Sequence, residues 1–221
     1  MIIACLGMKG GSGKTTLAIN LACGLAANPK NRVLLLDSDE QASAIRWYEE
    51  RPENRPKVEM IHMPEADQLK NQFTELSEQF SWIVIDGSPR MDHLSTVTMG
   101  ITDLVFIPVQ PSPLDIWATE QLIDRIQMVL KIRPNFRAAF VLNRYNPTTL
   151  IAQSAAEALK TLALPVLNAT MGQRVAYGEA ITQGLSVLEY SDTRAAAEMT
   201  SIMDALEQMK NGKEPFLMNG K

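Results

Sequence analysis

The feature that most constrains the fold is a glycine-rich segment that joins an apolar run to a helical pattern. The apolar run Ile2–Leu6 predicts a buried strand, and the segment Lys9–Thr16, KGGSGKTT, leads into a helix expected over Lys14–Ala27. Glycines let the backbone turn tightly and bring its N–H groups against phosphate oxygens, and the helix N-terminus adds the positive end of its dipole. A phosphate-binding loop requires this strand–loop–helix order, so the segment predicts a nucleotide site.

The residues of this loop have distinct expected roles. Backbone N–H groups would cradle the phosphates, the Lys14 ammonium would reach the β- and γ-phosphates, and the Thr15 hydroxyl would ligate Mg²⁺. The residues expected to bind the nucleotide here are Gly10, Gly11, Ser12, Gly13, Lys14, Thr15 and Thr16.

Short apolar runs alternate with longer helical patterns along the whole chain. The expected strands are Ile2–Leu6, Arg32–Asp37, Val58–His62, Trp82–Asp86, Leu104–Val109, Ala138–Asn143 and Pro165–Leu167. The expected helices are Lys14–Ala27, Ala42–Glu50, Glu65–Gln79, His93–Gly100, Ile116–Ile132, Thr149–Leu162, Val175–Gln183 and Arg194–Lys210. Runs such as VLLLD and WIVID are near-continuously apolar, which predicts a doubly wound, mostly parallel sheet with helices on both faces. We expect one α/β domain over residues 1–212 and a short tail over residues 213–221.

Composition restricts the class of protein further. The 221 residues are 46% hydrophobic, which excludes a disordered chain, and no apolar run approaches the roughly 20 residues of a membrane span. Cys5 and Cys23 lie in predicted core elements and are expected to be buried free thiols of a cytoplasmic protein. The net charge of −4 argues against a dedicated nucleic-acid binder. The acidity lies in the first half, because residues 1–110 hold 10 Lys and Arg against 14 Asp and Glu, and residues 111–221 hold 11 of each.

Carboxylates follow two of the apolar strands, at the sheet edge where such folds bind ligands. Asp37 and Asp39 close the second predicted strand, and Asp86 closes the fourth. One carboxylate can hold Mg²⁺ through water while another orients the attacking water. We expect Asp37 and Asp86 at the metal, together with Thr15. The alternative is that Asp37 or Asp39 only caps the next helix.

Four segments resemble the ParA/MinD family of ATPases, which are P-loop proteins with a deviant Walker A motif. Met8 stands where the usual phosphate loop has glycine and Lys9 follows it directly, similar to the family's K-G-G-x-G-K-[ST]. Glu40 departs from the family pattern, because it occupies the proline position of D-x-D-P-Q. The other three segments are Asp37–Gln41, Trp82–Pro89 and Pro108–Asp115, the last being close to that of small plasmid partition ATPases.

The resemblance implies roles for individual residues that the residue types and their spacing do not determine. Lys9 would reach across a nucleotide-bound dimer to the partner's phosphates, acting in catalysis with Lys14. Asp39 would be the group that activates water. Asn143, at the end of the sixth strand, would pair with the adenine edge. Pro111 would contact the nucleotide or the dimer partner, or would only stiffen its turn.

The resemblance also implies binding to DNA without sequence preference. Such binding needs only local positive charge, contributed when the dimer aligns its two copies. The candidate DNA-contacting residues are Arg174, Arg194, Lys210 and Lys213, with Lys131, Arg133 and Arg137 as a second cluster. The alternative is that these are ordinary solvated charges, and for Arg174 a contact with the dimer partner.

The protein that this resemblance implies is a slow ATPase with ATP and Mg²⁺ as cofactors. It would form a homodimer on binding ATP, associate with nucleoid DNA in the cytoplasm, and drive plasmid or chromosome partition with a centromere-binding or cargo adaptor protein that stimulates hydrolysis. The alternatives are the same switch with another cargo, such as a carboxysome or chemoreceptor cluster, a membrane switch similar to MinD, or an enzyme such as an iron–sulfur reductase or biotin-pathway ligase. The tail lacks an amphipathic basic stripe, so no membrane partner is expected.

Overall fold

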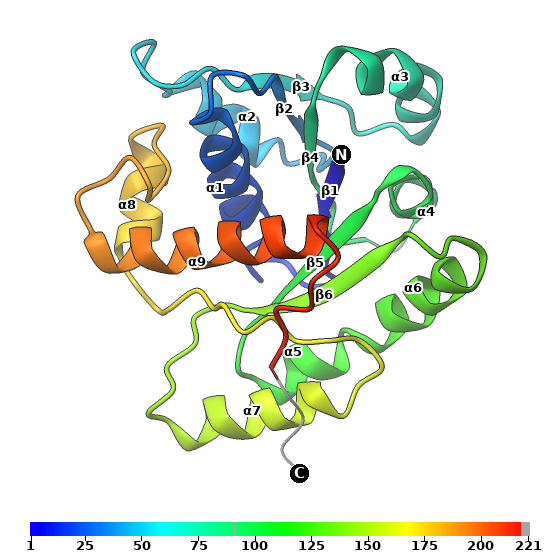
Figure 1. The fold of residues 1–221 in the computed structure, drawn as a ribbon, viewed down its shortest axis with the longest axis vertical. Helices are drawn as coiled ribbons and strands as arrows, with labels where there is room; N and C mark the ends of the chain where they lie inside the picture. Colours follow the sequence, from blue (N-terminus) through cyan, green and yellow to red (C-terminus); the bar gives the residue numbers. More distant parts are fainter. Residues whose placement is uncertain (91, 218–221) are drawn as a thin grey trace.

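A parallel sheet forms the centre of the molecule (Figure 1). The structure is a computed structural model and describes residues 1–90 and 92–217. The six strands lie in the order β3-β2-β4-β1-β5-β6, and every pair of neighbours is parallel. The strands are β1 (Ile2–Cys5), β2 (Val33–Asp37), β3 (Glu59–His62), β4 (Trp82–Asp86), β5 (Leu104–Val109) and β6 (Arg137–Leu142). The predicted doubly wound α/β sheet is confirmed.

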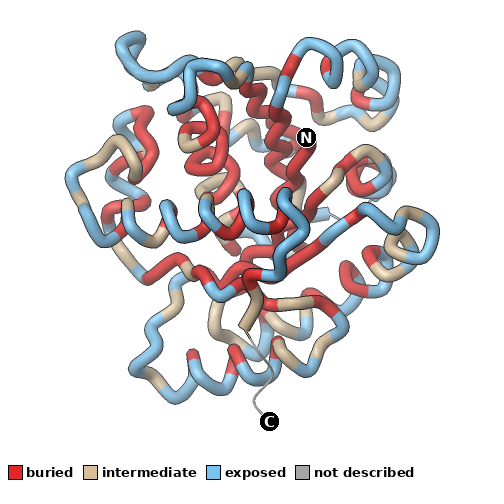
Figure 2. Tube along the Cα trace, in the orientation of Figure 1, coloured by how far each residue is buried: buried red, intermediate tan, exposed pale blue. Residues whose placement is uncertain are grey.

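Helices cover both faces of the sheet, so most strand residues are buried on either side (Figure 2). One core layer contains residues of α1, α2, α8 and α9, and the other contains residues of α3, α4, α6 and α7. Alternate residues of β1 enter the two layers, Ile3 the first and Ala4 the second. The helices are α1 (Lys14–Ala26), α2 (Ser43–Glu49), α3 (Ala66–Gln79), α4 (His93–Ile101), α5 (Pro113–Trp117), α6 (Glu120–Ile132), α7 (Leu150–Lys160), α8 (Ala176–Thr182) and α9 (Thr193–Lys210).

The strand expected over Pro165–Leu167 is wrong, because this segment makes only single bridges. Phe140 pairs with Val166, and Leu167 pairs with Phe216. Proline has no N–H, so Pro165 contributes only its carbonyl, which accepts from Phe140 N at 2.8 Å, and a continuous ladder cannot form.

Part of the expected tail packs on the body of the protein. Leu217 N donates to the carbonyl of Val166 at 2.8 Å, and Asn168 N donates to that of Pro215 at 3.0 Å. Residues 215–217 therefore continue the hydrogen bonding beyond β6. The rest of the tail, residues 218–221, lies outside the described residues.

The single helix expected over Ile116–Ile132 is also wrong, because the chain forms α5 and α6 with a turn between them. Pro113 occupies the first turn of α5, where its fixed φ is compatible with a helix start. The Thr119 hydroxyl donates to the carbonyl of Ile116 at 2.6 Å, and this local bond competes with a continuous helix. Along the described part of the chain, no helix is both long and apolar enough to cross a membrane.

Candidate nucleotide site

The carboxyl edge of the sheet gathers the residues singled out from the sequence. The phosphate loop follows β1 at the sheet centre, and the register pairs Asp37 of β2 with Asp86 of β4. A pocket of about 670 Å³ opens above this edge. Its lining includes the loop glycines, Lys14 to Thr16, Asp39, Asn143, and a wall formed by residues 172–175, 177, 178 and 181. The structure thus brings the predicted phosphate loop, Asp39 and Asn143 together.

Asn143 supports the phosphate loop from beneath. Gly13 has φ +106°, and a Cβ at this position would lie 2.2 Å from the Asn143 amide nitrogen, so only glycine fits. That amide donates to the Ser12 carbonyl at 2.7 Å, and its oxygen accepts from Arg144 N at 2.8 Å. Both ends of the side chain therefore have backbone partners, and adenine pairing by Asn143 stays a prediction.

Lys14 is buried and folds back over its own loop. Its ammonium donates to the carbonyl of Lys9 at 3.1 Å. Burial lowers the pKa of Lys14, and the negative charges of Asp86 and Asp39 oppose this effect. A cation held among two acids at the start of a helix is well placed to meet phosphate oxygens.

Asp86 is fully buried, and among residues 1–90 and 92–217 neither of its carboxylate oxygens has a hydrogen-bond partner of good geometry. Burial, and after it the charge of Asp37, raise the pKa of Asp86 to about 7 against the opposing effect of the nearby Thr15 hydroxyl. An unpartnered buried carboxylate beside a hydroxyl fits a divalent cation. Within residues 1–90 and 92–217, no cluster of three or more His, Cys, Asp or Glu could hold a metal unaided. These residues fit Mg²⁺ carried by a nucleotide, which supplies the remaining oxygen ligands.

Asp37 makes the contacts of a helix cap. Its carboxylate accepts from the backbone N–H groups of Asp39 at 3.0 Å, Ala44 at 2.9 Å and Ile45 at 3.3 Å. The capping alternative is therefore present in the structure, and contact between Asp37 and a metal stays a prediction. Asp39 lies on the pocket wall with its carboxylate accepting from Gln41 N at 3.1 Å.

Lys9 pairs with Asp115 in the same chain. The Lys9 ammonium donates to the Asp115 carboxylate, which is buried, whereas the lysine side chain is 47% exposed. Gln110 also donates to the Gly11 carbonyl at 2.6 Å. Residues on both sides of Pro111 in the sequence therefore contact the phosphate loop. The direct role predicted for Pro111 stays untested.

Glu40 joins two loops that border the pocket. Its carboxylate pairs with Arg90 at 3.0 Å, and both side chains are 62% exposed. Glu40 follows Asp39, and Arg90 follows Pro89, which lines the pocket. The sequence marked Glu40 as a departure from the family pattern but offered no signal for its partner.

The basic residues proposed to contact DNA occupy separate places. Arg174 pairs with Glu198 at 2.7 Å and lines the pocket, and Lys210 lies 4.8 Å from the centre of the Trp82 ring. Arg194 is exposed in the first turn of α9.

The second basic cluster contains two arginines that bind carbonyls at helix ends. Arg133 donates to the carbonyls of Met99, Gly100 and Thr102 at the end of α4, and Arg137 donates to that of Met209 in α9. These helix-end contacts account for both side chains without DNA.

The sheet, the loop and the pocket define a nucleotide-binding protein of the P-loop class. The model of the CobQ/CobB/MinD/ParA nucleotide binding domain matches residues 3–187. The chain belongs to this family.

Two relatives carry the same name. The chain is 31% identical to the "maintenance of carboxysome distribution protein A" of Halothiobacillus neapolitanus, over 95% of this chain and 94% of the relative. It is 34% identical to the protein of that name from Gloeobacter kilaueensis, over 88% and 87%. Cobyrinic acid a,c-diamide synthase from Mycobacterium smegmatis, solved with an ATP analogue and magnesium, has a TM-score of 0.79 at 19% identity over 99% of both chains. At that identity the likeness shows the fold alone.

Proposed function

We propose that this chain is an ATP- and Mg²⁺-dependent ATPase that positions a large cargo inside the cell. The observation that carries the proposal is the buried, unpartnered carboxylate of Asp86 beside Thr15, at the foot of the phosphate loop. A buried carboxylate without a partner is unfavourable, and a divalent cation bound with the nucleotide phosphates supplies the missing positive charge.

Different groups of the chain would bind the phosphates, hold the metal and orient the attacking water. Loop N–H groups between Gly10 and Gly13 would bind the phosphates, and Lys14 would exchange the Lys9 carbonyl for a phosphate oxygen. Thr15 and, through water, Asp86 would hold Mg²⁺, whose charge offsets that of the phosphates. Asp39 on the pocket wall would orient the water that attacks the terminal phosphate.

ATP would join two subunits face to face. Lys9 is bound to Asp115 of its own chain in the structure, and half of its side chain is open to solvent. We infer that Lys9 leaves this carboxylate to meet the phosphates of the second subunit, where its charge offsets that developing on the transferred group. Asp115 lies on α5 between the exposed side chains of Leu114 and Trp117, which supports this face as the contact.

The cargo that the relatives favour is the carboxysome, since two relatives at 31% and 34% identity are named for its distribution. Partition of plasmids or chromosomes is the second candidate, favoured by the segment Pro108–Asp115, which resembles that of small partition ATPases. In both cases the dimer would bind nucleoid DNA weakly, with Arg174, Arg194 and Lys210 as candidate contacts, and an adaptor protein would stimulate hydrolysis.

Nucleotide binding is tested by titrating ATP and Mg²⁺ into the purified protein in a calorimeter. Lys14→Ala should weaken binding by roughly a hundredfold or more, because a charge-assisted contact to phosphate is lost. Lys30→Ala removes an exposed lysine far from the loop and serves as the matched control. Equal affinities of Lys14→Ala and the wild-type protein would exclude the phosphate loop.

The two catalytic assignments are separated by sedimentation and turnover measurements. Lys9→Ala should bind ATP normally but fail to dimerise or to hydrolyse it. Asp39→Ala should accumulate as an ATP-bound dimer. Normal dimerisation and turnover of Lys9→Ala would refute the cross-subunit role, and fast turnover of Asp39→Ala would refute the water-orienting role.

DNA binding is tested with duplexes of arbitrary sequence. We expect an ATP-dependent shift that weakens steeply as salt rises, because phosphate contacts release counterions. Absence of binding at low salt would favour the membrane or enzyme alternatives. The gene beside this one then separates the cargoes, since carboxysome genes or a small basic DNA-binding protein indicate different adaptors.

A further inference from the structure

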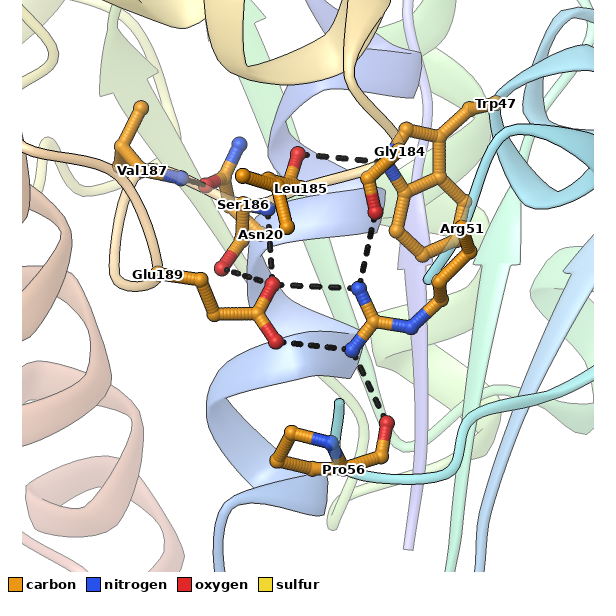
Figure 3. Close-up of polar contacts among 9 residues, drawn as sticks. All are labelled: Asn20, Trp47, Arg51, Pro56, Gly184, Leu185, Ser186, Val187 and Glu189. Carbon is orange, nitrogen blue, oxygen red and sulfur yellow. Dashed lines mark hydrogen bonds and ion pairs between the residues drawn. The ribbon is translucent and has the colours of Figure 1, made fainter. Parts of the chain in front are cut away.

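A buried ion pair lies behind the nucleotide pocket, outside the residues assigned so far (Figure 3). Arg51, just after α2, donates from both terminal nitrogens to the two carboxylate oxygens of Glu189, at 2.9 and 3.1 Å. The two side chains are only 5% and 12% exposed. The Trp47 ring lies 5.1 Å from the guanidinium carbon. A bidentate arginine pair at this burial fixes both distance and orientation.

The same arginine binds backbone on two sides. It donates to the carbonyl of Gly184 at 3.0 Å and to that of Pro56 at 2.9 Å. Glu189 in turn accepts from the backbone N–H of Ser186 at 2.9 Å and from its hydroxyl at 3.0 Å. Residues 184–189 thus form one short loop folded around the guanidinium, which Figure 3 shows from the side. We call it the clamp loop.

The clamp loop also bonds to two helices that begin at the pocket. Val187 N donates to the Asn20 side chain in α1 at 2.8 Å, and the Asn20 amide donates to the carbonyl of Thr16, a pocket residue, at 2.7 Å. In α2, Trp47 Nε1 donates to the Leu185 carbonyl at 3.2 Å. The loop is therefore fixed to the helix of the phosphate loop and to the helix that follows Asp39.

A third element is joined through the chain itself. Helix α8 ends just before the clamp loop, and its residues Tyr177, Gly178 and Ile181 line the pocket. Gly184 approaches the end of α2 closely, because a Cβ there would lie 2.3 Å from the Glu50 carbonyl oxygen. Three walls of the pocket, from α1, α2 and α8, thus meet at one loop, and Arg51 bonds to Gly184 at its start and to Glu189 at its end.

We propose that Arg51 and Glu189 are positioning residues for the nucleotide site: their ion pair holds the clamp loop, and through it sets α8 against α1 and α2 at the width that a nucleotide needs. The inference rests on the proposed function, since it assumes that the pocket binds ATP. Loss of the pair should raise the dissociation constant for ATP and the KM, while kcat at saturating ATP changes little, because neither side chain lines the pocket.

The test uses the double substitution Arg51→Met with Glu189→Met. Removal of one partner would leave a buried charge unpaired and could unfold the protein, whereas removal of both leaves apolar side chains of similar length. The matched control is Arg32→Met with Glu59→Met, which removes an exposed pair at the opposite edge of the sheet. Titration calorimetry with Mg²⁺ and ATPγS gives affinity, and circular dichroism gives the melting temperature.

We expect the double variant to melt as one cooperative unit and to bind ATPγS roughly tenfold more weakly, with the control unchanged. Trp47→Phe, which loses the bond to Leu185 together with part of a buried ring, should weaken binding by a smaller factor and keeps the test valid if the double variant does not fold. Wild-type affinity in the folded double variant, or in Trp47→Phe when the double variant is unfolded, overturns the proposal. Failure of the wild-type protein to bind would instead reject the proposed function.

Discussion

At the scale of single residues, we expect the buried carboxylate of Asp86 to lower the stability of the nucleotide-free protein and to provide the candidate Mg²⁺ site. Among the described residues this carboxylate has no hydrogen-bond partner of good geometry, and its pKa is raised to about 7, chiefly by burial. Asp86→Asn removes the charge, so the nucleotide-free protein should gain roughly 1–3 kcal/mol at pH 8, the asparagine amide still lacking partners. The same variant should lose the stabilisation that Mg²⁺ and ATP give the wild-type protein. Chemical denaturation with and without Mg²⁺ and ATP measures both effects.

The matched control for this prediction is Asp92→Asn. Asp92 caps α4 by accepting from Ser95 N at 3.0 Å, and asparagine is an equally good cap. Asp92→Asn should therefore leave both the stability and the effect of Mg²⁺ close to wild type. A nucleotide-free Asp86→Asn protein that is less stable than wild type would contradict the view that this carboxylate is held at a cost.

The carboxylate of Glu189 predicts that the free energy of unfolding decreases as the pH falls. Burial alone would raise its pKa, but hydrogen bonds from Arg51 and Ser186 hold it below the ordinary 4.5. A lowered folded-state pKa contributes stability above pH 4.5, and this contribution is lost as the pH falls below that value. Glu189→Gln should therefore be less stable at neutral pH and should lose less free energy of unfolding between about pH 5 and pH 3. Urea denaturation at each pH measures the difference, and parallel pH curves would contradict it.

At the scale of elements, residues 215–217 pack on the segment that lies beyond β6. Phe216 is half-buried and packs against the core layer of α1 and α9. Phe216→Ala should cost about 1–2 kcal/mol, less than for a fully buried ring. Leu150→Ala on α7, at a side chain 81% exposed, should change stability by less than about 0.5 kcal/mol. Urea denaturation measures both stabilities. Equal losses in the two variants would mean that the packing of Phe216 does not contribute to the free energy of unfolding.

The strands of the sheet were predictable because their signal is local. VLLLD and WIVID are apolar at every position before the closing aspartate, and β2 and β4 occupy these residues to within one position of the predicted bounds. The segment Pro165–Leu167 was equally apolar, but the missing N–H of Pro165 and its place beyond β6 leave it single bridges only. The turn between α5 and α6 contains a hydroxyl bond from Thr119, which the helical period does not reveal.

The site was predictable only in part, because some of its contacts are local in the sequence and others are not. The phosphate loop and Asp86 follow their strands directly, so adjacency in the sequence locates them. The partners of Lys9 and Arg51 lie 106 and 138 residues away, and no local pattern links them. Asp37 shows the remaining difficulty, because a metal ligand and a helix cap require the same residue type at the same strand end.

At the scale of the whole molecule, the exposed apolar side chains of α5 predict how two copies meet. Trp117 is 63% exposed and Leu114 is 64% exposed, on either side of the partner of Lys9. Trp117→Ala should weaken the proposed ATP-dependent dimer by roughly tenfold, because an exposed aromatic side chain is lost from the proposed contact, while ATP binding is retained. Met128→Ala on α6, also exposed, serves as control. Equilibrium sedimentation with ATP measures the effect, and a dimer constant unchanged by Trp117→Ala would place the contact elsewhere.

The central place of β1 in the sheet has a consequence for how the protein is made. The first strand leaves the ribosome early, yet its neighbours in the sheet are β4 and β5. Met1 bonds to Ser81 across 80 residues, and Ile2 bonds to Asp103 across 101. At about 5–20 residues per second, synthesis reaches β5 several seconds after β1, and contacts so distant in sequence form slowly. The strand before the phosphate loop therefore lacks both of its neighbours in the sheet until β4 and β5 have been synthesised.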